Sequence, residues 1–194
     1  IELFQCPSSN VEKAVANAQG VDGRVPCTYL ACSSGTLRLE SGPPPWAGDK
    51  DRNISDGIFY SNSETRQAEI KDGTSTTILI GEALFDFYLN GPDEVGDPEI
   101  VDHWYIGSDY LGPESFDLSS DVSEAIGSTA APLNATNDPD SHINEKELCF
   151  SSLHPGGAQV VFADGHAKFY AETIDPVVWS ALGTRNGGEV RTQD

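Results

Sequence analysis

The sequence predicts an α+β fold, in which an antiparallel β-sheet carries short helices packed on one side. Residues 158–171 alternate apolar and polar side chains around an Asp-Gly pair, which is the strongest short signal for a β-hairpin. Residues 76–88 form the longest run of apolar and β-branched residues, which favours a buried strand. Asp175 and Pro176 then precede an apolar stripe, which is typical of a capped helix.

The remaining elements are shorter. Ser9 to Glu12 resembles a capping box, and apolar residues at helical spacing follow as far as Gly20, so we expect a short helix there. Residues 28–33 and 101–106 are candidate strands, and residues 58–61 are a brief strand or a turn. A chain of 194 residues is expected to form a single domain over 1–194, with an insertion at about 107–146 where periodicity is weak.

The hairpin has a predicted register. A two-residue turn at Asp164-Gly165 places Phe162 opposite Ala167 and Val160 opposite Phe169. The core face would then carry six residues: Ala158, Val160, Phe162, Ala167, Phe169 and Ala171. In the helix that follows, Val178, Trp179 and Leu182 form the apolar stripe, and Gly183 ends the helix.

Charge restricts the partners of this chain. The net charge is −20, and residues 72–145 contain no Lys or Arg. Such a chain is not expected to bind nucleic acid, which requires a positive surface, or anionic membranes. The charge is compatible with divalent cations or cationic partners, and equally with simple solubility. No apolar run is long enough to span a membrane.

Two oxygen-rich segments are candidate calcium sites, because Ca²⁺ takes several oxygen ligands from flexible loops. The stronger candidate comprises Asp138, Asp140, Asn144 and Glu145, although it lacks the register of an EF-hand loop. Asp93 and Asp97 belong to a weaker candidate. No cofactor is required by any motif, and Ca²⁺ is the only ion that the sequence suggests.

Glu82 is the single acid of greatest interest, because it lies just beyond the most apolar part of the chain. A carboxylate there must be paired or have a raised pKa. It is either a general acid or metal ligand, or a structural group paired with Arg185 or Arg66 or bonded to a turn. The structural interpretation is favoured, since structural ion pairs also perturb the pKa of such groups.

His154 and Asp164 are separated by nine residues, which are expected to be mostly extended. Because an extended chain rises roughly 3.3 Å per residue, the two side chains should lie near opposite ends of one strand and should not share a metal. Asp164 is expected to serve the turn, and His154 to bond a neighbouring backbone group. The usual hydrolase, phosphate-loop and zinc-protease motifs are missing from the sequence, so no enzyme activity is predicted.

Several strings, taken in order, resemble the pseudopilin-like family identified by a C-terminal H-X9-DG motif, whose members are secreted or surface proteins abundant in planctomycete-type bacteria. The strings are Phe4 to Ser8, Asp56 to Phe59, Ile70 to Ser75, Gly81-Glu82, His154 with Asp164-Gly165, and Thr184 to Glu189. The typical prepilin-type start, with its long hydrophobic helix, is not among these residues.

The resemblance implies a soluble head of a non-catalytic structural subunit, in a type IV pilin-like or type II secretion pseudopilus-like assembly outside the cytoplasm. Its partners would be copies of itself or other pilin-like subunits, and it would reach a membrane only through the N-terminal helix. The resemblance also adds weight to calcium, since pilin-like heads in secretion systems often hold a structural Ca²⁺. The alternative is a secreted binding module for calcium, a glycan or a small solute, for which the aromatic run His103 to Tyr105 is a candidate groove.

The four cysteines are Cys6, Cys27, Cys32 and Cys149. In an exported chain, an even number of cysteines predicts two disulfides. Cys6 would pair with either Cys27 or Cys32, and Cys149 would pair with whichever of these two remains. Buried free thiols are the alternative.

Overall fold

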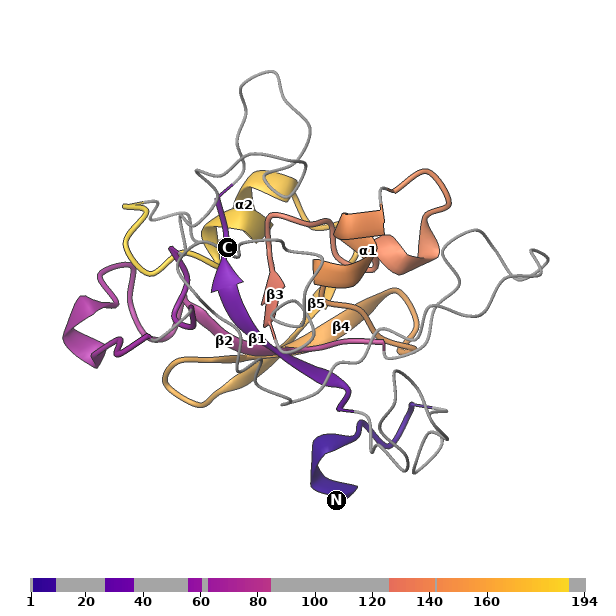
Figure 1. Ribbon diagram of the computed structural model, residues 1–194, viewed down its shortest axis with the longest axis horizontal. Helices are drawn as coiled ribbons and strands as arrows, with labels where there is room; N and C mark the ends of the chain where they lie inside the picture. Colours follow the sequence, from indigo (N-terminus) through magenta and orange to yellow (C-terminus); the bar gives the residue numbers. More distant parts are fainter. Residues whose placement is uncertain are drawn as a thin grey trace, which may run out of the picture.

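The computed structural model describes residues 2–9, 27–36, 56–60, 63–84, 126–141 and 143–188. Within them, a five-stranded sheet has the order β3-β1-β2-β4-β5 (Figure 1). The strands are β1 (Tyr29–Ser34), β2 (Ile78–Glu82), β3 (Ile126–Ser128), β4 (Gly157–Phe162) and β5 (Ala167–Ala171). The helices are α1 (Ile143–Leu148) and α2 (Pro176–Ala181), with 3₁₀ turns η1 (Glu2–Phe4), η2 (Gln67–Glu69) and η3 (Ala135–Asn137).

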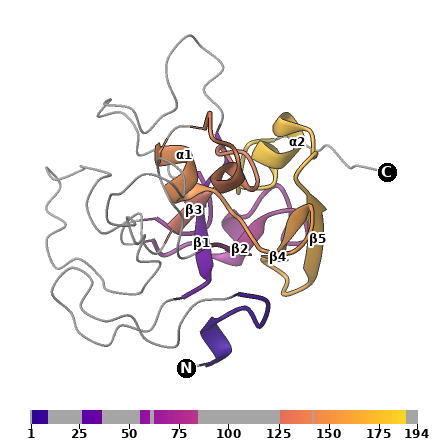
Figure 2. The ribbon, with the colours of Figure 1, turned by 90° about the vertical axis from the view of Figure 1, so that its right-hand side faces the viewer.

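The predicted α+β class is confirmed, and the sheet is mixed. The pairs β1–β2, β2–β4 and β4–β5 are antiparallel, whereas β1 and β3 are parallel. Both α1 and α2 lie on the same side of the sheet in two perpendicular views (Figures 1 and 2). In the described part of the chain, no helix is long and apolar enough to cross a membrane.

The core lies between the sheet and α2. Trp179 of α2 is 1% exposed, and its ring meets that of Phe150 edge-on at 6.0 Å. The indole N–H of Trp179 donates to the carbonyl of Ala131 at 3.0 Å, so the polar atom of this buried ring is satisfied. The sheet contributes Leu30 from β1, Ile78 from β2 and three alternating side chains of β4: Ala158, Val160 and Phe162.

The predicted hairpin forms, but its register is corrected by one residue. The amide of Phe162 donates to the carbonyl of His166, and the amide of Gly165 donates to the carbonyl of Phe162. The loop between Phe162 and His166 therefore has three residues. Gly165 has φ +91°, which matches a three-residue hairpin loop whose last residue is left-handed. Val160 consequently faces Lys168 rather than Phe169.

This shift reverses the two faces of β5, because side chains alternate along a strand. Tyr170, expected on the outer face, is 8% exposed and packs in the core with Phe162 and Trp179. Phe169, expected in the core, is 46% exposed. The faces predicted for β4 are correct, whereas those predicted for β5 are wrong.

The helix predicted after Asp175 is confirmed as α2. The Asp175 side chain accepts hydrogen bonds from the amides of Val177 and Val178, and Pro176 occupies the first helical position. Trp179 and Leu182 are buried, and Gly183 follows the C-cap. The cap and the apolar stripe depend on residues only a few positions apart, so the local sequence is sufficient to predict this helix.

Other predictions have mixed outcomes. The strand expected at 28–33 is β1, and the described part of the run 76–88 contains the five-residue strand β2, while residues 85–88 lie outside the described residues. Residues 56–60 form bends that bond to β1 through two amides. The stretch 107–146 contains β3, which sequence periodicity missed because it is only three residues long. The strand expected at 101–106 and residues 10–20 of the expected helix lie outside the described residues.

Candidate functional site

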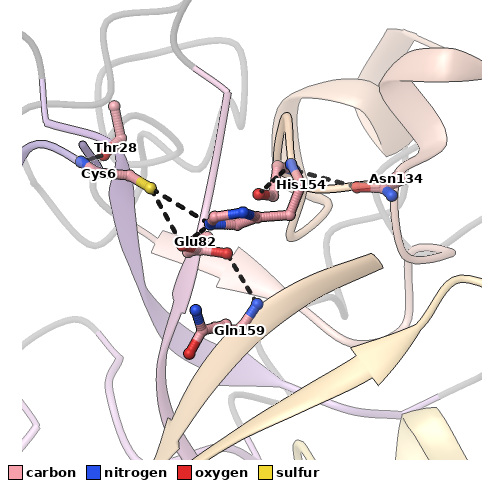
Figure 3. A network of polar contacts seen from close by, with 7 residues as sticks. Cys6, Thr28, Glu82, Asn134, His154 and Gln159 are labelled. Carbon is pink, nitrogen blue, oxygen red and sulfur yellow. Dashed lines mark hydrogen bonds and ion pairs between the residues drawn. The ribbon is translucent and has the colours of Figure 1, made fainter. Parts of the chain in front are cut away.

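Three side chains from distant parts of the chain meet beside β2, and we call them the Cys6–Glu82–His154 cluster (Figure 3). Glu82 is the last residue of β2 and is 5% exposed. Cys6 follows η1 in the N-terminal segment, and His154 belongs to the loop between α1 and β4. Cys6 and the His154 side chain are partly exposed, so the cluster is open to solvent on one side.

The three functional atoms form a closed triangle. Oε1 of Glu82 lies 3.3 Å from Sγ of Cys6 and 3.2 Å from Nε2 of His154. Sγ of Cys6 lies 3.6 Å from the same Nε2. Each of the three atoms therefore contacts both of the others.

Hydrogen bonds from neighbouring residues hold Glu82 and Cys6. The second carboxylate oxygen of Glu82, Oε2, accepts a hydrogen bond of 2.8 Å from the amide of Gln159 in β4. The amide of Cys6 donates to Oγ1 of Thr28 at 2.6 Å, and the amide of Thr28 donates to the carbonyl of Phe4 at 3.0 Å. These bonds hold the Glu82 carboxylate and the backbone of Cys6 in place in the absence of any ligand.

The loop that carries His154 is held by a second set of bonds. The amide of His154 donates to Oγ of Ser152, and the amide of Ser152 donates to Oδ1 of Asn134, each at 3.0 Å. Nδ2 of Asn134 donates to Glu172 at 2.9 Å. Asn134 has φ 60° and is the only non-glycine residue with positive φ in the described ranges. Its side-chain hydrogen bonds to Ser152 and Glu172 hold Asn134 in this left-handed conformation.

The Cys6 thiol has a raised pKa. Burial is the main cause, and the hydrogen bond to Glu82 and its negative charge raise the pKa further. At neutral pH the thiol is therefore protonated and donates its hydrogen to Glu82.

The predicted partner of Glu82 is corrected. Arg66 is exposed beside η2, Arg185 donates to the carbonyl of Gly57 and lies over the ring of Tyr60, and the described contacts of Glu82 are with other groups. Glu82 instead accepts a hydrogen bond from the Cys6 thiol and lies 3.2 Å from Nε2 of His154. Sequence could not show this, because Cys6, Glu82 and His154 are far apart along the chain.

Asp164 serves the turn, as predicted. Its Oδ1 accepts from the amide of His166 at 3.1 Å and contacts the ring nitrogen Nδ1 at 2.6 Å. These bonds lower the pKa of Asp164. Asp164 and Gly165 follow β4, whereas His154 precedes it and joins the Cys6–Glu82–His154 cluster, so the two halves of the H-X9-DG string have separate roles.

The structure describes only part of the two calcium candidates. Asp138 accepts hydrogen bonds from the amide of Asp140 and the hydroxyl of Ser141, which is how an Asp closes a turn. In the part of the chain that the structure describes, the group of side chains placed to hold a metal ion is Cys6, Glu82 and His154, and it does not include Asp138, Asp140 or Glu145. Asn144 lies in α1, and Asp93 and Asp97 fall outside the described residues.

The predicted disulfides are corrected, since Cys6, Cys27, Cys32 and Cys149 are all free thiols. Sγ of Cys32 points to the carbonyls of Ser34 and Gly183, and Sγ of Cys149 to that of Lys146. Cys32 and Cys149 also belong to different core clusters, which keeps them apart. Burial raises the pKa of Cys32 to about 12 and that of Cys149 to about 11.

The strings that carried the family resemblance meet in space at two places. Phe4 to Ser8, Gly81-Glu82 and the His154 string each supply one member of the Cys6–Glu82–His154 cluster. The strings Ile70 to Ser75 and Thr184 to Glu189 meet at Asp72, whose carboxylate accepts from the amides of Gly187 and Gly188 and the hydroxyl of Thr184. Asp56 to Phe59 meets the same C-terminal string at Arg185, which donates to the carbonyls of Asp56 and Gly57. Membership of these strings is the sequence signal that singles out Cys6, Glu82 and His154, but it does not show that the three side chains meet.

Comparison with known proteins gives one match. A family model described as "Protein of unknown function (DUF1559)" matches residues 1–177. No curated protein and no solved structure matches the chain. Since the match covers most of the 194 residues, the chain belongs to the DUF1559 family.

Proposed function

We propose that this chain is the head of an exported, non-catalytic structural subunit that assembles with itself or with other pilin-like subunits, as in a type IV pilus or a type II secretion pseudopilus. The observation that supports this most directly is the N-terminal segment. Leu3 is 80% exposed and the adjacent Phe4 is 45% exposed, although the segment itself is bonded to the sheet. An apolar pair on a fixed segment is suited to contact another apolar element.

The position of this segment supports the proposal further. The N-terminal segment, residues 2–9, lies beyond the sheet on the side away from the helices α1 and α2 in both views (Figures 1 and 2). A segment in this position can enter an assembly while the sheet and its helices remain outside it. The net charge of −20 favours solubility of such an exposed head.

The alternative of a secreted binding module for calcium, a glycan or a small solute has less support. Its strongest candidate, the Asp138 segment, uses its carboxylate to close a turn. The aromatic run His103 to Tyr105 lies outside the described residues.

The native gene product tests the proposal. Intact mass and N-terminal sequence of the native protein, combined with a photo-crosslinking residue at Leu3, should reveal an apolar segment ahead of Ile1 and a ladder of crosslinked subunits. Val177, which is 41% exposed on α2, is the matched control position and should give little crosslinking. A native protein that begins near Ile1 and crosslinks no better from Leu3 than from Val177 would exclude the assembly role.

A further inference from the structure

The geometry points to a transition-metal site at Cys6, Glu82 and His154, and we propose that it binds zinc. The inference concerns the cluster alone and does not depend on the assembly role. Each residue offers one ligand atom, and the three atoms lie within 4.8 Å of one another. A thiolate, an imidazole and a carboxylate together are a ligand set that Zn²⁺ uses in proteins.

The distances fit a tetrahedral ion. With Zn–S of about 2.3 Å and Zn–N and Zn–O of about 2.0 Å, neighbouring ligand atoms lie roughly 3.3 to 3.6 Å apart. The three edges of the cluster are 3.2, 3.3 and 3.6 Å, and the longest joins sulfur to nitrogen. A zinc ion can therefore be held between these three atoms with little movement of the side chains.

The same geometry argues against a nucleophilic triad. In such a triad the nucleophile contacts one nitrogen of the imidazole, which acts as the base, and the carboxylate contacts the other nitrogen and orients the ring. Here both Glu82 and Cys6 approach Nε2 of His154. The atoms converge on one point, as metal ligands do, and do not form a relay.

The surroundings meet the other requirements of a metal site. The amide of Gln159 holds Oε2 of Glu82, which leaves Oε1 directed at the cluster, and this is the role of an outer-shell partner. The His154 side chain is 26% exposed, which provides a path for entry. Because the described residues supply three ligands, the fourth position would take water or an added ligand.

A bound ion would join three parts of the chain. The N-terminal segment would be linked to the end of β2 and to the loop before β4 (Figure 3). The thiolate makes calcium and magnesium poor occupants, because both prefer oxygen ligands. The site therefore differs from the calcium site expected from sequence in its residues and in its ion.

The test uses the untagged 194-residue chain, reduced and freed of metal. Zn²⁺ is titrated against a chromophoric chelator, and Co²⁺ is added separately to report sulfur ligation by its thiolate charge-transfer absorption. We expect one Zn²⁺ per chain, the Co²⁺–thiolate band, and a higher melting temperature with Zn²⁺ but not with Ca²⁺.

Substitutions identify the ligands. Cys6→Ser should abolish the Co²⁺–thiolate band. It should also weaken Zn²⁺ binding by more than about 100-fold, because the loss of an outer-shell partner alone can cost that much and Cys6 is a direct ligand. His154→Gln should weaken binding similarly. The matched controls are Cys27→Ser, a second partly buried thiol, and His166→Gln, a second histidine beside a carboxylate, and both should bind as the unmodified chain does.

Circular dichroism identifies any variant that fails to fold, and Glu82→Gln, which keeps the size of the side chain, serves as a further ligand variant. No saturable Zn²⁺ binding by the unmodified chain, or equal binding by Cys6→Ser, would overturn the proposal. In either case the three residues form only a hydrogen-bonded link between the N-terminal segment and the sheet. Crosslinking from Leu3 is scored separately, so failure of the zinc site and failure of the assembly role are distinguishable.

Discussion

Oδ1 of Asn134 accepts the amide hydrogen of Ser152 at 3.0 Å, and this bond fixes the loop that presents His154 to Glu82. Oγ of Ser152 in turn accepts the amide of His154. A buried asparagine in a left-handed conformation thus determines where the imidazole lies.

Asn134→Ala should lower the free energy of unfolding by about 2–4 kcal/mol, because it removes two hydrogen bonds, each worth about 1 kcal/mol, and leaves a non-glycine residue with positive φ. Asn134→Gly loses the same bonds without the backbone cost, so it should destabilise by about 1–2 kcal/mol less than Asn134→Ala. Urea denaturation measures both. Equal stability of the two variants would show that the backbone conformation carries no cost.

Gly81 and Phe150 form a close contact that should tolerate no added methyl group. A Cβ at Gly81 would overlap the buried ring of Phe150. Gly81→Ala should therefore destabilise the fold by about 1–3 kcal/mol through overpacking. The double variant Gly81→Ala, Phe150→Leu should lose less stability than the sum of the two single variants, and strict additivity in thermal melts would contradict direct contact.

The four thiols should differ in reactivity. Burial raises the pKa of Cys32 to about 12 and that of Cys149 to about 11, so both carry little thiolate at mildly alkaline pH and are shielded from reagents. Cys6 and Cys27 are partly exposed and should react first with an aromatic disulfide reagent. All four should react in denaturant without a reductant. Fewer reactive thiols under those conditions would indicate disulfides and contradict the free-thiol structure.

Asp164 should make the stability of the hairpin depend on pH. Its pKa in the folded protein is lowered from 3.8, chiefly by the hydrogen bond from the amide of His166. Because the folded pKa is lowered, the contribution is fully present above the unfolded pKa and is lost as pH falls through the folded value. Asp164→Asn keeps the turn acceptor but does not titrate. The difference in unfolding free energy between the two proteins should therefore shrink on acidification, and a carboxyl NMR titration should give a pKa below 3.8.

Local sequence determined those features of this protein that depend on neighbouring residues. The cap by Asp175 and Pro176 and the apolar stripe of α2 act within a few residues, so the helix was predicted correctly. The Asp-Gly pair placed the hairpin for the same reason. It did not set the loop length, because loops of two and three residues both accept glycine with positive φ at position 165. One residue of difference moved Tyr170 into the core and Phe169 to the surface.

The tertiary structure alone decided which distant groups meet. Cys6 precedes Glu82 by 76 residues and His154 by 148, and no local pattern encodes which carboxylate lies beside which thiol. The parallel pairing of β3 with β1 is of the same kind, since three residues are too few to show periodicity. Helix caps and turns result from short-range backbone bonds and are legible in the sequence, whereas the Cys6–Glu82–His154 cluster exists only because the sheet and its loops bring three remote segments together.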